Sequence, residues 1–423
     1  MIAELLSKYK VVIGNVISLS ILQALNYILP LVTVPYLVRI LGPEKYGIII
    51  FASAFICYFQ IITDYGFNMS ATRSVSINKS NKEKLNEIFS SVMLIKIILT
   101  ILCFVSLLII VFSVSQFRYN YKVYILLYGM VVGNLLSPIW FFQGMEQMKY
   151  ITGINVVIKF FLSLFIFVLI RKESHYLLVV YLNSISYILI GVTSLWIVLK
   201  KFNIKFKIYK LNIIKSELKE GWYIFTTSFF SNILTTSGIF VLGLFSSKEI
   251  VGYYGAIDKI VKALVLMFSP ITQAVFPHVS ATFKKSFFEG EKEIIKLAKI
   301  ILPFVTVLCI LLYMFNRDIV FILYGHNFAK YTCILKYMTF WIFLSILNNF
   351  LGIQYLIGSG NSKYYSRSFV MSAITTLVLF ITLIKSNSFN AIIIGTSLGE
   401  LVLTLVMICY IKFKIKKEFT IIN

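Results

Sequence analysis

Lysines inside apolar segments are the residues of this sequence whose type and position could do chemistry. Lys159 lies nine residues from one end and eleven from the other of the run 150–170, which is otherwise free of charge. Lys96, Lys259 and Lys262 also fall inside apolar segments. Because an ammonium at membrane depth costs at least a few kcal/mol, it normally faces a protein interior or a water-filled cavity. These lysines predict that the chain handles something anionic within the membrane.

The composition defines the class of protein that must position these lysines. Apolar residues make up 59% of the 423 residues and charged residues only 13%, and the mean hydropathy is +0.88. A water-soluble globular protein has a far more polar composition. The chain is therefore predicted to be an all-α membrane protein that crosses the bilayer many times.

Runs of about 20 apolar residues, the length that spans a bilayer, predict about 12 transmembrane helices. They cover residues 11–38, 46–69, 87–114, 121–142, 150–170, 176–199, 221–246, 250–277, 297–316, 332–357, 366–385 and 390–411. The connections between them are short. Nearly all of the chemistry is therefore expected within the membrane.

The basic residues predict the orientation and the division into lobes. Most of the 40 Lys and Arg residues fall in the two terminal tails and in alternate connections, so both termini are expected to be cytoplasmic. The connection 200–220, with seven lysines, separates six segments from six. We predict an amino-terminal lobe at 1–199, this basic cytoplasmic linker, a carboxy-terminal lobe at 221–412 and a tail at 413–423. Two parallel six-helix lobes would enclose a central cavity.

The net charge of +23 is then mostly a signal of topology and a contact surface for anionic membrane lipids. Nucleic acid is not expected as a partner, because the basic residues are spread over short connections without a folded soluble module around them.

Short sequence words spread over nearly the whole chain resemble those of bacterial O-antigen and related polysaccharide flippases. They are NYILPL (26–31), PYLVRILGPE (35–44), YG (46–47), DYGFN (64–68), GN (133–134), PIWFFQG (138–144), PITQA (270–274) and GIQ (352–354). The resemblance implies the multidrug, oligosaccharidyl-lipid and polysaccharide exporter superfamily, in which two lobes rock about a central cavity.

The same resemblance implies a function in surface polysaccharide biosynthesis at the bacterial cytoplasmic (inner) membrane. A flippase of this kind moves an undecaprenyl-pyrophosphate-linked oligosaccharide, such as an O-antigen repeat unit, from the cytoplasmic to the periplasmic leaflet. Membrane lipids and other polysaccharide-assembly proteins are the further partners expected. The protein is not expected to be an enzyme or to hold a cofactor, although a gradient of H⁺ or Na⁺ would reset the carrier.

Lys159 is the first candidate for binding the pyrophosphate, because a mobile ammonium can bind and release a phosphate. A structural ion pair with a carboxylate such as Asp64 or Glu400, and snorkelling toward the lipid headgroups, are the alternatives.

The other cationic candidates are Lys259, Lys262, Lys96 and Arg39. Asp258 and Lys262 are four residues apart, so an ion pair along one helix face is an alternative for Lys262. On a helix, Lys259 points about 100° away from Asp258, so it is expected to face the cavity. Lys96 could instead snorkel from the end of its helix, and Arg39 could be an interfacial anchor.

Glu400, Asp64 and Asp258 are the candidates for ion coupling or for ion pairing with the buried lysines. Glu400 lies in the middle of the run 391–411, at the depth expected of a proton-coupling residue. Asp64 lies near the end of its segment, where a structural role is favoured over ion coupling.

Pro30, Pro35, Pro270 and Pro277 are candidates for gating kinks. A proline inside a helix removes a backbone donor and bends the axis, although membrane helices also tolerate such kinks without using them.

Two other functions were weighed. A drug or cation antiporter of the same superfamily would need an acidic pocket, whereas lysines outnumber acids in the predicted spans. A membrane glycan polymerase would need a reactive constellation, but the three histidines fall in separate connections and no metal, triad or nucleotide motif is found.

Overall fold

The computed structural model describes residues 2–207, 209, 211–384 and 388–415, and within these ranges it contains helices and no strands. The all-α prediction is confirmed. The chain divides into two compact units, Met1–Phe229 and Phe230–Asn423, which are described separately here as the first and the second unit. The division falls inside helix α10 (Leu211–Phe245).

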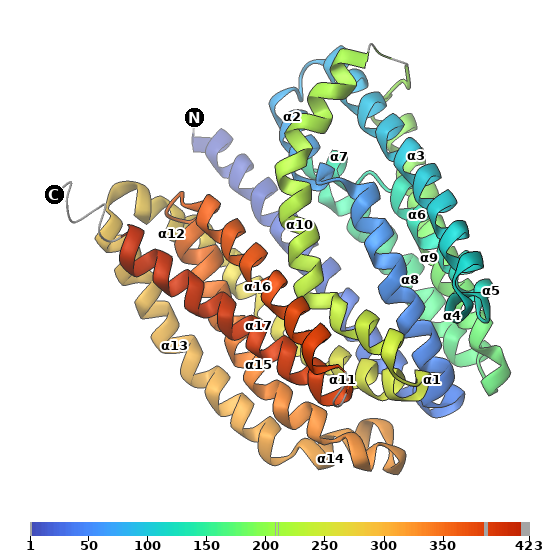
Figure 1. The fold of residues 1–423 in the computed structure, drawn as a ribbon. Coiled ribbons are helices and arrows are strands. Elements are labelled where there is room, and N and C mark those ends of the chain that lie inside the picture. The colour runs from blue at the N-terminus through green and yellow to red at the C-terminus, as the bar shows by residue number, and fades with distance from the viewer. Residues whose placement is uncertain (1, 208, 210, 385–387, 416–423) are drawn as a thin grey trace. The chain divides into compact units, whose positions relative to one another are not determined.

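The first unit is built from long helices joined by short turns (Figure 1). Its elements before α10 are α1 (Ile2–Asp64), α2 (Phe67–Ile77), α3 (Lys82–Ser113), α4 (Ser115–Arg118), α5 (Tyr121–Leu127), α6 (Gly129–Leu136), α7 (Ile139–Gly144), α8 (Met148–Leu169), η1 (Glu173–His175) and α9 (Tyr176–Lys201).

Helix α1 is interrupted, as the two predicted segments 11–38 and 46–69 require. Gly42 has φ 74° and ψ 163°, a non-helical conformation that glycine adopts without steric cost, and Pro43 follows it. The apolar region Ser20–Ile77 has 58 residues. At 1.5 Å per residue a straight helix of this length would measure about 87 Å, far more than the ~30 Å hydrocarbon core. The kink at Gly42 therefore separates two membrane segments.

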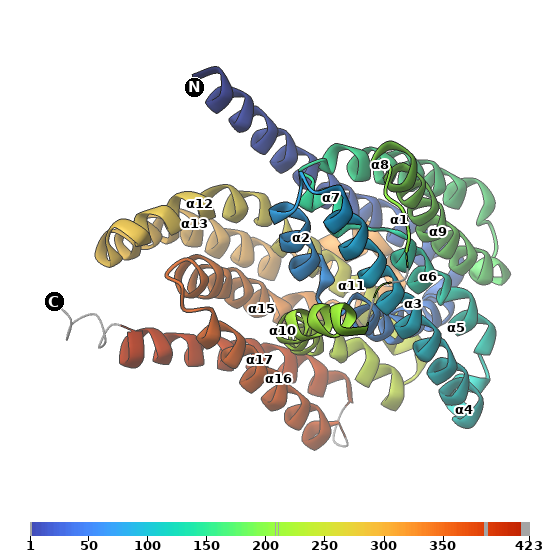
Figure 2. The same cartoon turned by 90° about the horizontal axis from the view of Figure 1, so that it is seen from above.

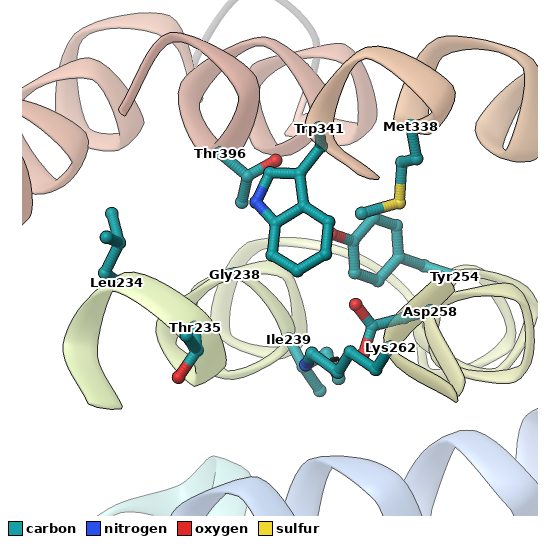
Figure 3. A pocket seen from close by; sticks show the side chains of 10 residues that line it. All are labelled: Leu234, Thr235, Gly238, Ile239, Tyr254, Asp258, Lys262, Met338, Trp341 and Thr396. Carbon is teal, nitrogen blue, oxygen red and sulfur yellow. Dashed lines mark ion pairs between the residues drawn. The ribbon is translucent and has the colours of Figure 1, made fainter. Parts of the chain in front are cut away.

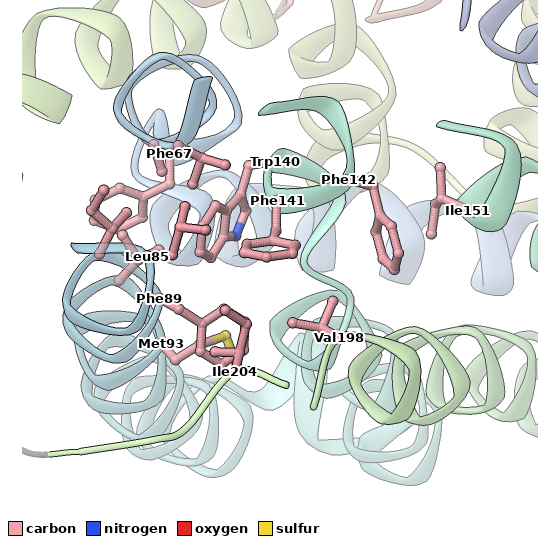
Figure 4. Close-up of a cluster of buried hydrophobic side chains, with 14 of the residues drawn as sticks. Phe67, Leu85, Phe89, Met93, Trp140, Phe141, Phe142, Ile151, Val198 and Ile204 are labelled. Atoms are coloured by element: carbon pink, nitrogen blue, oxygen red, sulfur yellow. The ribbon is translucent and has the colours of Figure 1, made fainter. Parts of the chain in front are cut away.

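An aromatic core holds α7 against α2 and α3 in the first unit (Figure 4). Trp140, Phe141 and Phe142 are fully buried, and the ring of Phe89 lies 5.8 Å from that of Trp140. Burying each large apolar side chain stabilises the fold by about 1.5–3 kcal/mol. The aromatic residues of the PIWFFQG motif therefore pack in the core of the first unit.

A glycine lets α6 and α9 approach closely in the same unit. A Cβ atom on Gly133 would lie only 2.3 Å from the backbone carbon of Tyr187 and 2.6 Å from the backbone nitrogen of Ile188. Only glycine fits between the two backbones without moving one of them. This close contact fixes the position of Tyr187 on α9.

The second unit continues α10 and adds helices that lie alongside one another in Figure 2. Among them, α15 and α16 both pack on α17. Its elements are α11 (Lys248–Leu266), α12 (Ser269–Lys285), α13 (Phe287–Met314), α14 (Asn316–Tyr324), η2 (His326–Tyr331), α15 (Cys333–Asn349), η3 (Phe350–Ile357), α16 (Ser362–Leu383), α17 (Ser388–Tyr410) and η4 (Ile411–Ile415).

The predicted single segment 250–277 is wrong, because the chain forms two helices there. Helix α11 ends at Leu266 and α12 begins at Ser269, with Pro270 in its first turn. Proline is tolerated in the first turn, where its missing N–H would have no helical partner. Pro270 therefore starts a helix and does not kink one, whereas Pro277 lies inside α12.

Ten helices of the described part of the chain are long and apolar enough to cross a membrane. One of them is Ser20–Ile77, which covers the predicted segment 46–69 and most of the predicted segment 11–38. Helix α11 is not among the ten, and its sequence contains five charged residues: Lys248, Glu249, Asp258, Lys259 and Lys262. A multi-pass membrane protein is confirmed. The number of crossings and the cytoplasmic position of the termini stay predictions.

Candidate functional site

Lys159 lies near the middle of α8, where three helices of the first unit meet. Its ammonium donates a hydrogen bond to the side-chain oxygen of Asn26 on α1, and it lies 5.8 Å from the centre of the Tyr187 ring on α9. Two flanking contacts hold α8 on α1: the Thr152 hydroxyl donates to the Ser18 carbonyl at 2.9 Å, and the Tyr36 hydroxyl donates to the Ile170 carbonyl at 2.6 Å.

These partners of Lys159 are neutral. Among the described residues of the first unit, no carboxylate lies within ion-pairing distance of its ammonium. An ammonium has three N–H donors, and Asn26 accepts only one of them. A positive charge held by an amide and an aromatic face can bind an anionic oxygen without first breaking an ion pair.

Lys96 and Asp64 form a buried ion pair in the first unit, and this contradicts two expectations. The Lys96 ammonium lies 2.9 Å from Asp64 Oδ1 and 3.4 Å from the Asn134 carbonyl oxygen, and the Asn134 amide donates to Asp64 Oδ2 at 3.0 Å. Lys96 is only 1% exposed, so the snorkelling interpretation is wrong. The Lys159–Asp64 pair is also wrong, because Asp64 is taken by Lys96. The charges of Lys96 and Asp64 therefore neutralise each other within the first unit.

The second unit contains the predicted Asp258–Lys262 pair in a small pocket (Figure 3). The Lys262 ammonium lies 2.7 Å from Asp258 Oδ2. Tyr254 and Trp341 line the same pocket, which has room for about one water molecule. Lys262 is thus neutralised locally, as the ion-pair alternative predicted, and unlike Lys159 it has a carboxylate partner.

The structure places Lys259 on α11 and Arg39 on α1. Lys259 is half-buried on α11, one residue after the buried Asp258, and Arg39 is exposed on α1, three residues before the kink at Gly42. Pro30 and Pro35 lie in the helical part of α1, so the distinct break is at Gly42, a position that the kink candidates did not include.

Glu400 lines a cavity of the second unit. This space of about 350 Å³ lies between α10, α12, α15, α16 and α17, and we call it the Glu400 cavity. The Glu400 side chain is only 5% exposed, and Ser345 and Asn348 line the cavity beside it. Among the described residues of this unit, no lysine or arginine forms an ion pair with it. The alternative of a partner lysine is therefore wrong within the second unit, and a pair with Lys159 of the first unit stays a prediction.

Sequence reasoning missed the neutral side chains that surround these charges: Asn26, Tyr187, Asn134, Ser345 and Asn348. Asn26 and Asn134 lie inside the flippase-like words NYILPL and GN, which is the one signal that could have selected them. Tyr187 could be found only through the close packing of α6 and α9.

The comparison with protein families decides the identity. Residues 12–283, well over half of the chain, match the family described as "Polysaccharide biosynthesis protein". The chain belongs to this family.

Relatives of this polysaccharide biosynthesis protein are transporters. It is 29% identical over 369 residues to the "Putative O-antigen transporter" of Escherichia coli (strain K12), covering 87% of this chain and 89% of that protein. The resemblance to bacterial O-antigen and related polysaccharide flippases, which the sequence motifs indicated, is confirmed.

Solved structures show the fold of this family member. "Lipid II flippase MurJ, inward closed conformation" matches with a TM-score of 0.77 and 16% identity, covering 95% of this chain and 87% of that one. An inward-facing multidrug resistance MATE family transporter of the MOP superfamily matches with a TM-score of 0.71 and 15% identity, covering 95% and 98%. At 15–16% identity these two structures show the fold alone. The family and the E. coli relative that is named as a transporter confirm the predictions of a non-enzymatic protein and of a multi-pass protein of the bacterial inner membrane.

Proposed function

We propose that this protein is a flippase for an undecaprenyl-pyrophosphate-linked oligosaccharide, with Lys159 as the residue that binds the pyrophosphate. The observation that carries the proposal is the position of Lys159 in the middle of a membrane-spanning helix with only neutral partners in its own unit. The E. coli relative, named as an O-antigen transporter, supports the choice of a lipid-linked glycan.

The chemistry of such a substrate explains why a lysine is useful at this depth. The pyrophosphate is anionic and the glycan is very polar, so moving either of them through hydrocarbon unaided is prohibitively costly. An ammonium supplies a compact charge with rotatable donors, which binds a phosphate oxygen from several directions and releases it again. Asn26 and Tyr187 would hold the ammonium in place without neutralising it.

Transport would proceed by alternating access. The lobes predicted at 1–199 and 221–412, joined by the basic linker 200–220, would rock so that the binding site opens first to the cytoplasmic side and then to the periplasmic side. A gradient of H⁺ or Na⁺ would reset the carrier, with Glu400 as the residue to test for coupling. Other proteins of polysaccharide assembly would supply and consume the lipid-linked unit.

Replacing Lys159 tests this assignment. In a strain that depends on this gene, Lys159→Ala is expected to abolish surface polysaccharide and to leave the lipid-linked repeat unit in the cytoplasmic leaflet. Lys159→Arg, which keeps the charge, should retain part of the transport. The readouts are polysaccharide on gels, leaflet accessibility of the lipid-linked unit, and the amount of the protein in the membrane.

Lys336 provides the matched control. It is also a lysine inside an apolar segment and lies 4.8 Å from the centre of a tyrosine ring, that of Tyr313, but it is located in the first turn of α15. Lys336→Ala should leave the polysaccharide unchanged. Normal polysaccharide in the Lys159→Ala strain would sink the assignment of Lys159.

A cation antiporter is the second candidate, favoured only by the carboxylate of Glu400 in a cavity of the second unit. It predicts that cells lacking the protein become sensitive to cationic drugs while their surface polysaccharide stays normal. The flippase predicts the opposite pair of results.

A further inference from the structure

The Glu400 cavity differs from the surroundings of Lys159 in its charge. Among its described lining residues there is no lysine or arginine, and Glu400 is the one ionisable carboxylate. Hydroxyl and amide side chains also line the cavity, including those of Ser231, Thr235, Ser345 and Asn349. Such a wall does not attract a pyrophosphate, because its formal charge is negative. It fits a neutral group that carries many hydroxyls.

Asn348 and Thr404 hold the backbone of α17 at Glu400. Asn348 donates through its amide nitrogen to the Glu400 backbone carbonyl at 3.1 Å, and its side-chain oxygen accepts from the Thr404 hydroxyl at 2.8 Å. These two bonds fix Asn348 against α17 beside Glu400. A carboxylate has about four acceptor sites, so two neutral neighbours leave further sites for donors from a ligand.

A second acceptor lies in the same wall. The side-chain oxygen of Asn349 is inaccessible to solvent and has no hydrogen-bond partner among the described residues. An amide oxygen left without a donor costs about 1–3 kcal/mol when it is buried, so a native protein normally satisfies it with water or a ligand. Asn349 and Glu400 both line a cavity that would hold about a dozen water molecules at roughly 30 Å³ each. A donor from a ligand in this cavity would satisfy the Asn349 oxygen when the side chain turns toward it.

Aromatic rings complete the wall. Tyr365 and Phe369, one turn apart on α16, both line the cavity, and their ring centres are 4.8 Å apart. The Tyr365 ring packs against η3 at Gly352, which has no side chain. A Cβ atom on Gly352 would lie only 2.5 Å from the ring. The glycine of the flippase-like GIQ word therefore makes room for a ring of the cavity.

We propose that the Glu400 cavity is a glycan-binding subsite, which takes a sugar residue of the lipid-linked oligosaccharide. Sugar hydroxyls would donate to Glu400 and Asn349, and the apolar face of the sugar ring would pack against Tyr365 or Phe369. A cavity with mostly apolar surfaces and a few placed polar groups, and with a volume in the range of about 300–1,000 Å³, is typical of small-molecule sites.

This inference rests on the proposed flippase function and deepens it. The pyrophosphate and the glycan would be recognised by residues of different units, with a lysine for the anion and with Glu400 and neutral polar groups for the sugar. A lone bound cation is the competing occupant, but it uses neither the aromatic rings nor most of the hydroxyl and amide groups.

Binding of two probes to the purified full-length protein in lipid nanodiscs tests the subsite. One probe is undecaprenyl pyrophosphate without sugar, and the other is the same lipid bearing the repeat unit, extracted from host cells that lack the polymerase. Asn349→Ala is expected to weaken binding of the glycosylated probe about three- to tenfold, the effect of losing one hydrogen bond, and to leave binding of the sugar-free probe unchanged. Lys159→Ala should weaken both.

Controls keep the test independent of folding. Tyr365→Ala should behave like Asn349→Ala, whereas Tyr337→Ala, a tyrosine of α15 with 56% exposure, should bind both probes normally. Asn349→Ser is the milder variant if the alanine variant is not recovered as a monodisperse protein.

Equal binding of the glycosylated probe by wild type and Asn349→Ala overturns the subsite, and so does an equal loss for both probes. Sodium- or proton-dependent binding that is lost in Glu400→Gln, with unchanged glycan affinity, overturns it in favour of a cation. Wild-type protein that binds neither probe overturns the flippase function itself, and the subsite with it.

Discussion

The ion pair between Lys96 and Asp64 predicts an asymmetric loss of stability. At 2.9 Å and an effective dielectric constant of about 20, the Coulomb attraction is roughly 6 kcal/mol before the cost of desolvation. Asp64→Asn leaves the Lys96 ammonium buried at 1% exposure without a counter-charge, which should cost about 3–5 kcal/mol. Lys96→Met leaves a carboxylate that is 24% exposed and can be hydrated, so it should cost less, about 1–3 kcal/mol.

Thermal unfolding in detergent measures the difference. For 150–250 residues, a loss of 1 kcal/mol lowers Tm by about 2–4 °C, so Asp64→Asn should lower it by roughly 6–20 °C and more than Lys96→Met does. The double variant Lys96→Met/Asp64→Asn should recover most of the loss, because a neutral pair of similar shape leaves no buried charge. Equal effects of the two single variants, or a double variant as unstable as their sum, would refute the reasoning.

Two further predictions concern packing and pH. Gly133→Ala places a Cβ atom 2.3 Å from the Tyr187 backbone, so thermal unfolding should show a loss of stability of about 1–3 kcal/mol. Gly153→Ala on α8 is the control, because nothing lies within 4 Å of its Cβ position. It should leave stability unchanged or raise it by up to about 1 kcal/mol. Burial lowers the pKa of Lys248 to about 8, so below that pH the folded chain holds a partly desolvated ammonium and loses stability. Relative to Lys248→Met, the Tm of the wild type should rise as the pH increases from about 8 to about 10.4, the pKa of an unfolded lysine; parallel Tm curves over this range would contradict the prediction.

The sequence predicted the segments better than their breaks. Apolar length identifies a membrane segment because each span must satisfy its own backbone and cover about 30 Å of hydrocarbon. The interruption between α11 and α12 was missed because Met267 and Phe268 are apolar and continue the hydropathy signal. The sequence predicted a connection between the segments 11–38 and 46–69. It did not predict that this connection is a kink made by the positive φ of one residue, Gly42.

The sequence by itself determined that this is a helical membrane protein with charges in its spans and the words of a flippase family. Composition and spacing suffice for this, because hydrocarbon imposes the same requirement on every span. Only the tertiary structure decided which charges are neutralised. Lys96 and Lys159 look alike along the chain, yet α1 presents Asp64 to Lys96 and Asn26 to Lys159. A buried ammonium depends on atoms within about 4 Å of it, and residues far apart in the sequence supply those atoms.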